Sequence, residues 1–133
     1  YYTRHDYEEV ETDAANGVMT HIKAQLPALV GQQLGGLTVV AADDFSYLDP
    51  IDGSVSNNQG LRVVFDGGSR IVYRLSGTGT SGATIRVYIE RYEADPAQHG
   101  LETQVALSEL ISIANDFSQI AQKTGRLQPN VIT

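Results

Sequence analysis

Three stretches in the middle of the chain have the residue types of β-strands, and short glycine-containing segments join them. The sequence LRVVF (61–65) leads through Asp66-Gly67-Gly68 into SRIVYRLS (69–76), and ATIRVYIERY (83–92) follows. Alternating apolar and polar residues predict strands with one buried face, and a short turn containing glycine predicts a hairpin. The chain is therefore expected to build an antiparallel sheet that is covered on one face.

Helical patterns flank these strands. Asp6, with Glu9 three residues later, resembles a helix N-cap, and apolar residues recur beyond it at near-helical spacing: Tyr7, Val10, Ala14, Val18 and Ile22. Residues 103–123 show a second helical pattern, which Gly125 is expected to terminate.

The segment 37–49 reads as a further strand, before a turn-rich loop at 50–60. The expected order is thus helix, four strands, helix. This predicts a single α+β domain over residues 1–133, with two layers: a four-stranded, mainly antiparallel sheet, and N- and C-terminal helices packed on one of its faces.

Composition excludes several classes of function. The 133 residues include no cysteine, so a disulfide framework, a thiolate metal site and cysteine nucleophile chemistry are ruled out, and a cytoplasmic protein is expected. The formal net charge of −7 argues against nucleic acid as a partner, and no apolar run reaches the length needed to span a membrane. Because the only methionine is Met19, the chain is expected to be a piece of a longer protein.

Positive charge is concentrated around the second and third strands. Four arginines and one acid lie between Gly67 and Tyr92. Strand parity places Arg74 and Arg86 on the polar face, next to the two ends of the connecting loop. These arginines could bind an anion, or they could simply occupy an exposed strand face.

The connecting loop 77–82 is rich in glycine and hydroxyl residues. Gly77 and Gly79 would let backbone N–H groups approach a ligand, while Ser76 and Thr78 add hydroxyl donors. With two arginines beside it, the loop resembles a cradle for an oxyanion such as phosphate. An ordinary flexible hairpin loop is the alternative. The pattern G-x-G-x-x-G is not taken as a dinucleotide site, because a strand follows it where that motif requires a helix.

The loop sequence resembles the phosphate-binding loop of the phosphoglucomutase family, among the α-D-phosphohexomutases. The resemblance covers RLSGTGTSGATIR (74–86) with the residues that follow it (87–93), and the segments TRHDYEEV (3–10), DPIDGS (49–54), NQGLR (58–62), LISIA (110–114), TGR (124–126) and VIT (131–133). In the family, the first of these outer segments is expected to be the helix that opens the last of four domains. The resemblance also implies a fold like that of the TATA-box-binding protein.

What the resemblance implies about activity is specific. The family interconverts glucose 1-phosphate and glucose 6-phosphate through glucose 1,6-bisphosphate. It uses a phosphoserine and Mg²⁺ held in other domains, while the fourth domain binds the phosphate that is not transferred. The phosphate ligands carried over to this sequence are Arg74, Ser76, Gly77, Thr78 and Arg86, with Gly79 shaping the turn.

The parts of the family's active site that perform phosphoryl transfer have no counterpart in this sequence. No phosphoserine loop, metal-binding aspartate loop or sugar-reading segment is present, so no residue here is expected to be catalytic or to bind a metal. Asp43 and Asp44 are adjacent on a predicted strand and should point to opposite faces. The alternatives to a domain of such an enzyme are a standalone phosphate- or sugar-phosphate-binding module and a paralogue without catalysis.

Overall fold

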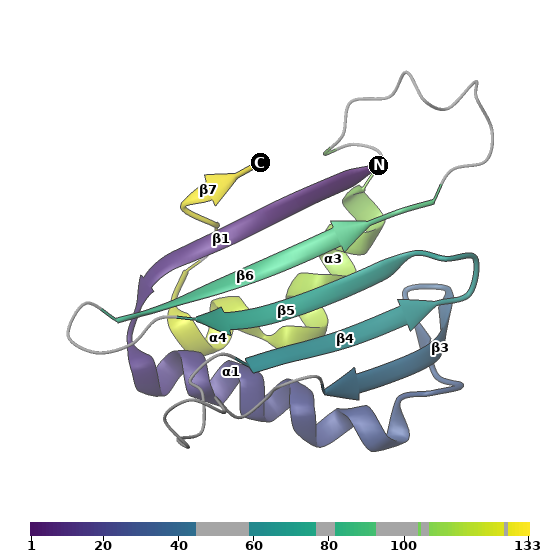
Figure 1. The fold of residues 1–133 in the computed structure, drawn as a ribbon, viewed down its shortest axis with the longest axis horizontal. Helices are drawn as coiled ribbons and strands as arrows, with labels where there is room; N and C mark the ends of the chain where they lie inside the picture. Colours follow the sequence, from purple (N-terminus) through teal and green to yellow (C-terminus); the bar gives the residue numbers. More distant parts are fainter. Residues whose placement is uncertain (45–58, 77–81, 93–103, 105–106, 127) are drawn as a thin grey trace, which may run out of the picture.

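The structure, a computed structural model, describes residues 1–44, 59–76, 82–92, 104, 107–126 and 128–133. Its elements follow the chain in this order: β1 (Tyr2–Val10), α1 (Thr12–Gln25), the 3₁₀ turn η1 (Leu26–Ala28), β2 (Gln33–Leu34), β3 (Leu37–Asp44), β4 (Gln59–Phe65), β5 (Arg70–Ser76), β6 (Ala83–Glu90), α3 (Ser108–Ser118), α4 (Ile120–Thr124) and β7 (Val131–Ile132). The fold is α+β, as predicted (Figure 1).

The sheet is antiparallel and has seven strands in the order β2-β3-β4-β5-β6-β1-β7. The four predicted strands are present as β3 to β6, although residues 45–49 of the first one lie outside the described residues. The prediction of a four-stranded sheet was wrong because β1, β2 and β7 were not recognised. The predicted turn at Gly67 and Gly68 is confirmed, with φ of +88° and +93°.

The N-terminal segment is a strand, which corrects the predicted helix start and the N-cap assigned to Asp6. β1 lies antiparallel to β6, and its register shifts between Tyr7 and Val10, where Glu9 has a φ of +55°. This bulge inserts one extra residue, so Tyr7 and Val10 are both buried although they are three positions apart. The same spacing occurs on a helix face, which explains the error. Helix α1 begins only at Thr12.

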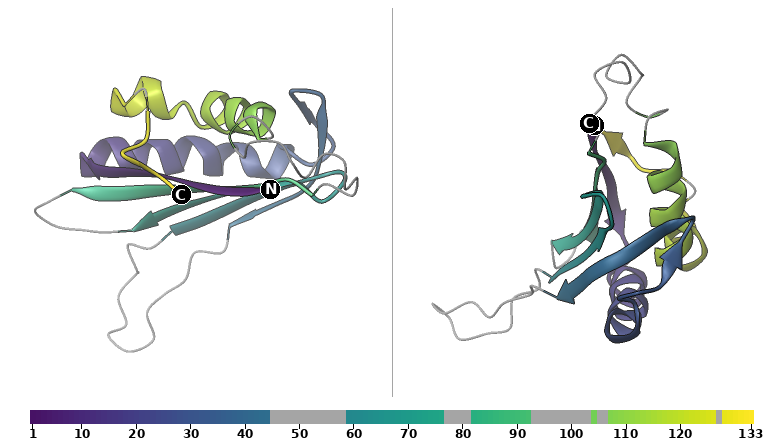
Figure 2. Two further views of the ribbon diagram at one scale, coloured as in Figure 1. Left: turned by 90° about the horizontal axis from the view of Figure 1, so that it is seen from above. Right: turned by 90° about the vertical axis from the view of Figure 1, so that its right-hand side faces the viewer.

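The helices cover one face of the sheet, as predicted, and the sheet curls around them (Figure 2). The core lies between the two layers. Its helical side consists of apolar residues at helical spacing, including Ala15, Val18, Met19 and Ile22 of α1 and Leu110, Ile113 and Ala114 of α3. The predicted C-terminal helix is interrupted, because Gln119 adopts a left-handed conformation between α3 and α4. Gly125 terminates α4 with a φ of +75°, as expected.

Strand alternation fixes the direction of each side chain in the central strands. In β5, the buried residues are Ile71, Tyr73 and Leu75, and in β6 they are Ala83, Ile85, Val87 and Ile89. These side chains pack against the helices. The intervening residues lie on the opposite face, where no helix among the described residues covers them (Figure 2). That open face carries the arginines.

Candidate functional site: an arginine row on the open face of the sheet

Arg74 of β5 and Arg86 of β6 are cross-strand partners in register. They project from the open face and stand two residues from Ser76 and Thr84, which form the last pair before the loop 77–81. The sequence predicted that both guanidinium groups would flank the loop if the two strands paired, and the register confirms that the strands pair with these two residues opposite each other. Gly77, Thr78 and Gly79 lie outside the described residues.

Like charges placed directly opposite each other on neighbouring strands destabilise a sheet. Among the described residues, the side chain of Arg74 makes no hydrogen bond or ion pair, and it is exposed. Nothing in the described part of the protein therefore neutralises the Arg74 side of the pair. Two neighbouring guanidinium groups can bind an anion placed between or beside them, since charge-assisted hydrogen bonds to carboxylate or phosphate are strong.

A hollow of about 290 Å³ lies on the open face and reaches Arg74 at one end. Two other arginines line it, but both have carboxylate partners. Arg62 donates to Asp43 from Nε at 2.9 Å and from Nη2 at 2.6 Å, and Arg70 donates to Glu90 from Nε at 3.2 Å and from Nη2 at 3.1 Å. Within the described residues, the hollow therefore offers an unpaired cation only at its Arg74 end.

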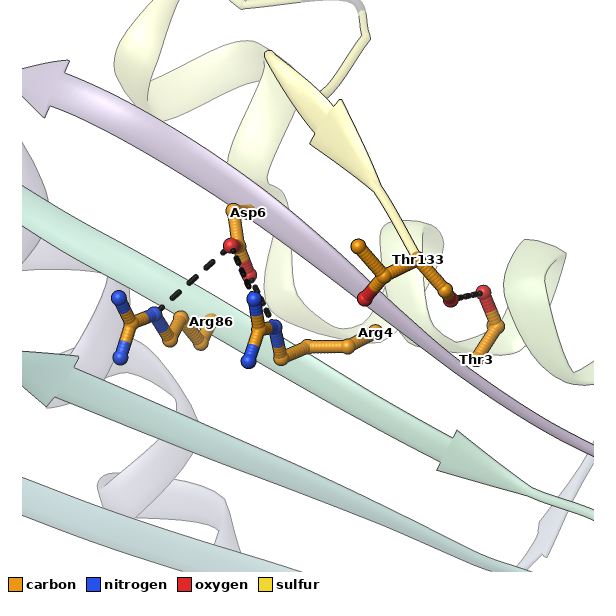
Figure 3. A network of polar contacts seen from close by, with 5 residues as sticks. All are labelled: Thr3, Arg4, Asp6, Arg86 and Thr133. Carbon is orange, nitrogen blue, oxygen red and sulfur yellow. Dashed lines mark hydrogen bonds and ion pairs between the residues drawn. The ribbon is translucent and has the colours of Figure 1, made fainter.

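On its other side, Arg86 faces a buried carboxylate. Asp6 of β1 is its cross-strand partner, and Arg86 Nε lies 3.8 Å from Asp6 Oδ2 (Figure 3). Arg4 Nη2 donates a 3.0 Å hydrogen bond to Asp6 Oδ2, and Arg4 Nε lies 2.9 Å from Oδ1. The hydrogen bond to Asp6 raises the pKa of Arg4. The side chain of Asp6 is only 3% exposed, so two guanidinium groups share one buried negative charge.

The end of β6 next to the loop is held by the bulge of β1. Gly82 has a φ of +88°, and a Cβ there would lie 2.8 Å from the carbonyl oxygen of Val10. Arg126 supports the same bulge: its Nη2 donates to the carbonyl oxygen of Glu9 at 2.9 Å, and its Nη1 donates to the side chain of Asn130 at 3.0 Å. The loop therefore leaves the sheet beside a tightly packed corner.

The remaining polar residues singled out in the sequence have structural partners. Asp43 and Asp44 point to opposite faces as predicted, toward Arg62 and toward Lys23 of α1 respectively. His5 is buried beside Gln104 at 3.0 Å. In the described part of the chain, no group of three or more histidine, aspartate or glutamate side chains is placed to hold a metal ion.

The sequence prediction named Arg74, Ser76 and Arg86, and it did not include Asp6 and Arg4, which contact Arg86 and Asp6 respectively. The available signal was the alternation of Thr3, His5 and Tyr7, which are all buried and mark a strand. Among the residues the structure describes, no helix is long and apolar enough to cross a membrane.

Comparison with known proteins gives consistent matches over the whole chain. The family model described as "Phosphoglucomutase-1, C-terminal domain" matches residues 1–130. A phosphoglucomutase of Rhizobium radiobacter is 58% identical over 133 residues, which cover 100% of this chain and 24% of the relative. Phosphoglucomutase-1 of Homo sapiens is 52% identical over 139 residues, covering 100% of this chain and 25% of its own.

A solved structure agrees with these matches. The open form of pp63/parafusin, a phosphoglucomutase from Paramecium, is similar with a TM-score of 0.78 and 47% identity, covering 100% of this chain and 22% of that one. The chain thus spans about a quarter of the length of the relatives it matches.

Proposed function

This chain belongs to the phosphoglucomutase family, in which it corresponds to the C-terminal domain, and we propose that it binds the phosphate of a sugar phosphate that is not being transferred. The observation that carries the proposal is the in-register pair Arg74 and Arg86 at the base of the loop. The ligand set is Arg74, Ser76, Gly77, Thr78 and Arg86, with Gly79 shaping the turn.

Phosphate is the ligand that suits these groups best. A guanidinium group donates two parallel hydrogen bonds to a phosphate and keeps its charge at every relevant pH. Hydroxyl and backbone N–H donors of the loop would satisfy the remaining oxygens. The like-charge cost of the arginine pair is then recovered when the ligand binds, which is the behaviour expected of a site built for a dianion.

The proposed reaction is the interconversion of glucose 1-phosphate and glucose 6-phosphate through glucose 1,6-bisphosphate. The phosphoserine, the Mg²⁺ ion and the groups that read the sugar would belong to three other domains of a longer cytoplasmic enzyme. The present chain would be its single fourth domain, with a fold like that of the TATA-box-binding protein. Its part is positioning: binding energy from the remote phosphate orients the sugar and favours a closed, water-poor cleft.

The test is Arg74→Ala in the full-length enzyme, with Arg70→Ala as the matched control. Both residues are arginines on the same face of β5, but Arg70 is paired with Glu90 and lies roughly 13 Å farther along the strand. Loss of a charge-assisted phosphate contact costs about 2–5 kcal/mol, so kcat/KM for glucose 1-phosphate should fall roughly 30-fold or more in Arg74→Ala. The control should stay near wild type. Equal kinetics in both variants would remove the arginine pair from substrate binding.

A further inference from the structure

Asp6 is a buried acid beside the proposed anion site. Its side chain is 3% exposed, and it lies on the face of the sheet from which Arg74 and Arg86 are presented. Burying a carboxylate costs several kcal/mol unless charged partners compensate for the lost hydration. It also places a negative charge beside a site that we assign to an anion. Because the Asp6 carboxylate would repel a bound anion, attraction for the ligand does not explain why an acid stands at this position.

The geometry of Arg86 supplies that explanation. Figure 3 shows its Nε edge facing Asp6 and its two terminal nitrogens on the far side. Asp6, Arg86 and Arg74 are successive cross-strand partners, so they form one row across β1, β6 and β5. The carboxylate thus faces the Nε edge of the Arg86 guanidinium group, while the two terminal nitrogens lie on the side away from Asp6.

Arg4 completes the arrangement. Its hydrogen bond of 3.0 Å to Oδ2, the oxygen that Arg86 also faces, and its second contact of 2.9 Å to Oδ1 fix the Asp6 carboxylate next to Arg86 (Figure 3). Without Asp6, Arg4 and Arg86 would be neighbouring cations with no anion between them among the described residues. Each would then reorient to increase its distance from the other.

We propose that Asp6 is a positioning residue that holds Arg86 in the orientation required for phosphate binding, with Arg4 fixing Asp6 in turn. The proposal rests on the proposed function of the Arg74–Arg86 pair. Three guanidinium groups and one carboxylate leave two unit positive charges in this cluster, which matches the charge of about −1.5 to −2 on a phosphate monoester at pH 7.

Whether removing the Asp6 charge strengthens or weakens the binding of a phosphate ester distinguishes a positioning role from a purely electrostatic one. Asp6→Asn preserves the shape of the side chain and makes the cluster more positive by one charge. If Asp6 affected the site only through its charge, this variant would bind a phosphate ester more tightly. If Asp6 orients Arg86, the variant binds more weakly in spite of the added positive charge, because misplacing a binding group by about 1 Å can cost up to roughly 100-fold.

The experiment measures kcat and KM for glucose 1-phosphate in the full-length enzyme. Asp6→Asn should lower kcat/KM by about 10- to 100-fold. The matched control is Asp43→Asn, which makes the same change to an aspartate on the same face, but one whose partner is Arg62. The control should remain within about twofold of wild type, since one exposed ion pair contributes little. An unchanged or increased kcat/KM in Asp6→Asn would overturn the proposal.

A double-mutant cycle distinguishes this proposal from the one on which it rests. In an Arg86→Ala background, Asp6→Asn should have no further effect, because Asp6 acts through Arg86. If Arg86→Ala is itself silent, the proposed phosphate site fails. If Arg86→Ala is impaired but Asp6→Asn is not, or if the two effects are additive, only the positioning role fails.

A folding assay and a charge-conserving variant complete the experiment. Circular dichroism and denaturant unfolding report whether Asp6→Asn is folded under the assay conditions. Asp6→Glu keeps the charge but moves the carboxylate relative to Arg86, so it should also lower kcat/KM by about 10-fold or more. Wild-type kinetics in Asp6→Glu would contradict the proposal, whatever the behaviour of Asp6→Asn.

Discussion

Arg74 and Arg86 lie directly opposite each other on neighbouring antiparallel strands, with a carboxylate on only one side of the pair in the described structure. A sheet selected for stability alone would avoid this pairing, since like charges opposite each other are destabilising. Residues that break a local rule in this way are expected at functional sites. Because the arginine pair lowers the stability of the sheet, a mutation that removes one of the two arginines is expected to raise stability while it weakens phosphate binding.

Arg74→Gln tests the stability part of this prediction. It should raise the free energy of unfolding of the 133-residue chain by about 0.2–1 kcal/mol, because it removes the like-charge contact with Arg86. Added sodium chloride screens charges and should reduce the difference between the variant and wild type. Urea unfolding at low and high salt measures both effects, and a less stable Arg74→Gln at low salt would contradict the interpretation.

Gly82, which directly precedes β6, is expected to be required for the stability of the fold. Its φ of +88° disfavours any residue with a Cβ, and a Cβ would lie 2.8 Å from the carbonyl oxygen of Val10. Gly82→Ala should therefore cost about 1–3 kcal/mol of stability.

Gly17 gives a matched control for this change. It lies inside α1, and a Cβ there would meet no heavy atom within 4 Å. Gly17→Ala should raise the free energy of unfolding by about 0.5–1 kcal/mol, through the higher helix propensity of alanine. Equal effects of the two substitutions in a denaturant titration would show that the corner at Gly82 is not tightly packed.

The burial of the Tyr73 hydroxyl predicts how the free energy of unfolding changes at alkaline pH. It is fully buried, its hydroxyl donates to the carbonyl oxygen of Ala114 at 2.8 Å, and burial raises the pKa of Tyr73 well above its ordinary value. Above about pH 10 the unfolded chain loses this proton while the folded chain keeps it. Stability should therefore fall as the pH rises beyond about 10, by up to about 1.4 kcal/mol per pH unit for this residue.

Tyr73→Phe tests that assignment. The variant should lose about 1 kcal/mol at neutral pH with the hydrogen bond to Ala114, yet show a shallower decline above about pH 10. Burial also raises the pKa of Tyr7, which accounts for part of the slope that remains. Tyr92→Phe, at a residue that is 68% exposed, serves as the control. An identical pH slope in wild type and Tyr73→Phe would contradict the prediction.

The arginine pair could be predicted because it depends on local periodicity alone. Once residues 70–76 and 83–90 form a hairpin, alternation decides which side chains face the core, and Arg74 and Arg86 follow on the other face. Asp6 could not be predicted in the same way. A bulged strand and a helix start can both place apolar residues three positions apart, and the sequence around Tyr7 and Val10 fits either one.

The sequence by itself determined the four strands β3 to β6, the face of β5 and β6 on which the arginines lie, the composition of the loop and the helices that cover the core. These features depend on residues that are close along the chain. The tertiary structure alone decided that Tyr2–Val10 lies beside β6 and that Asp6 meets Arg86, eighty positions later in the chain. That choice follows from backbone hydrogen bonding and burial across the assembled sheet, because local propensity is too weak to decide between the two conformations.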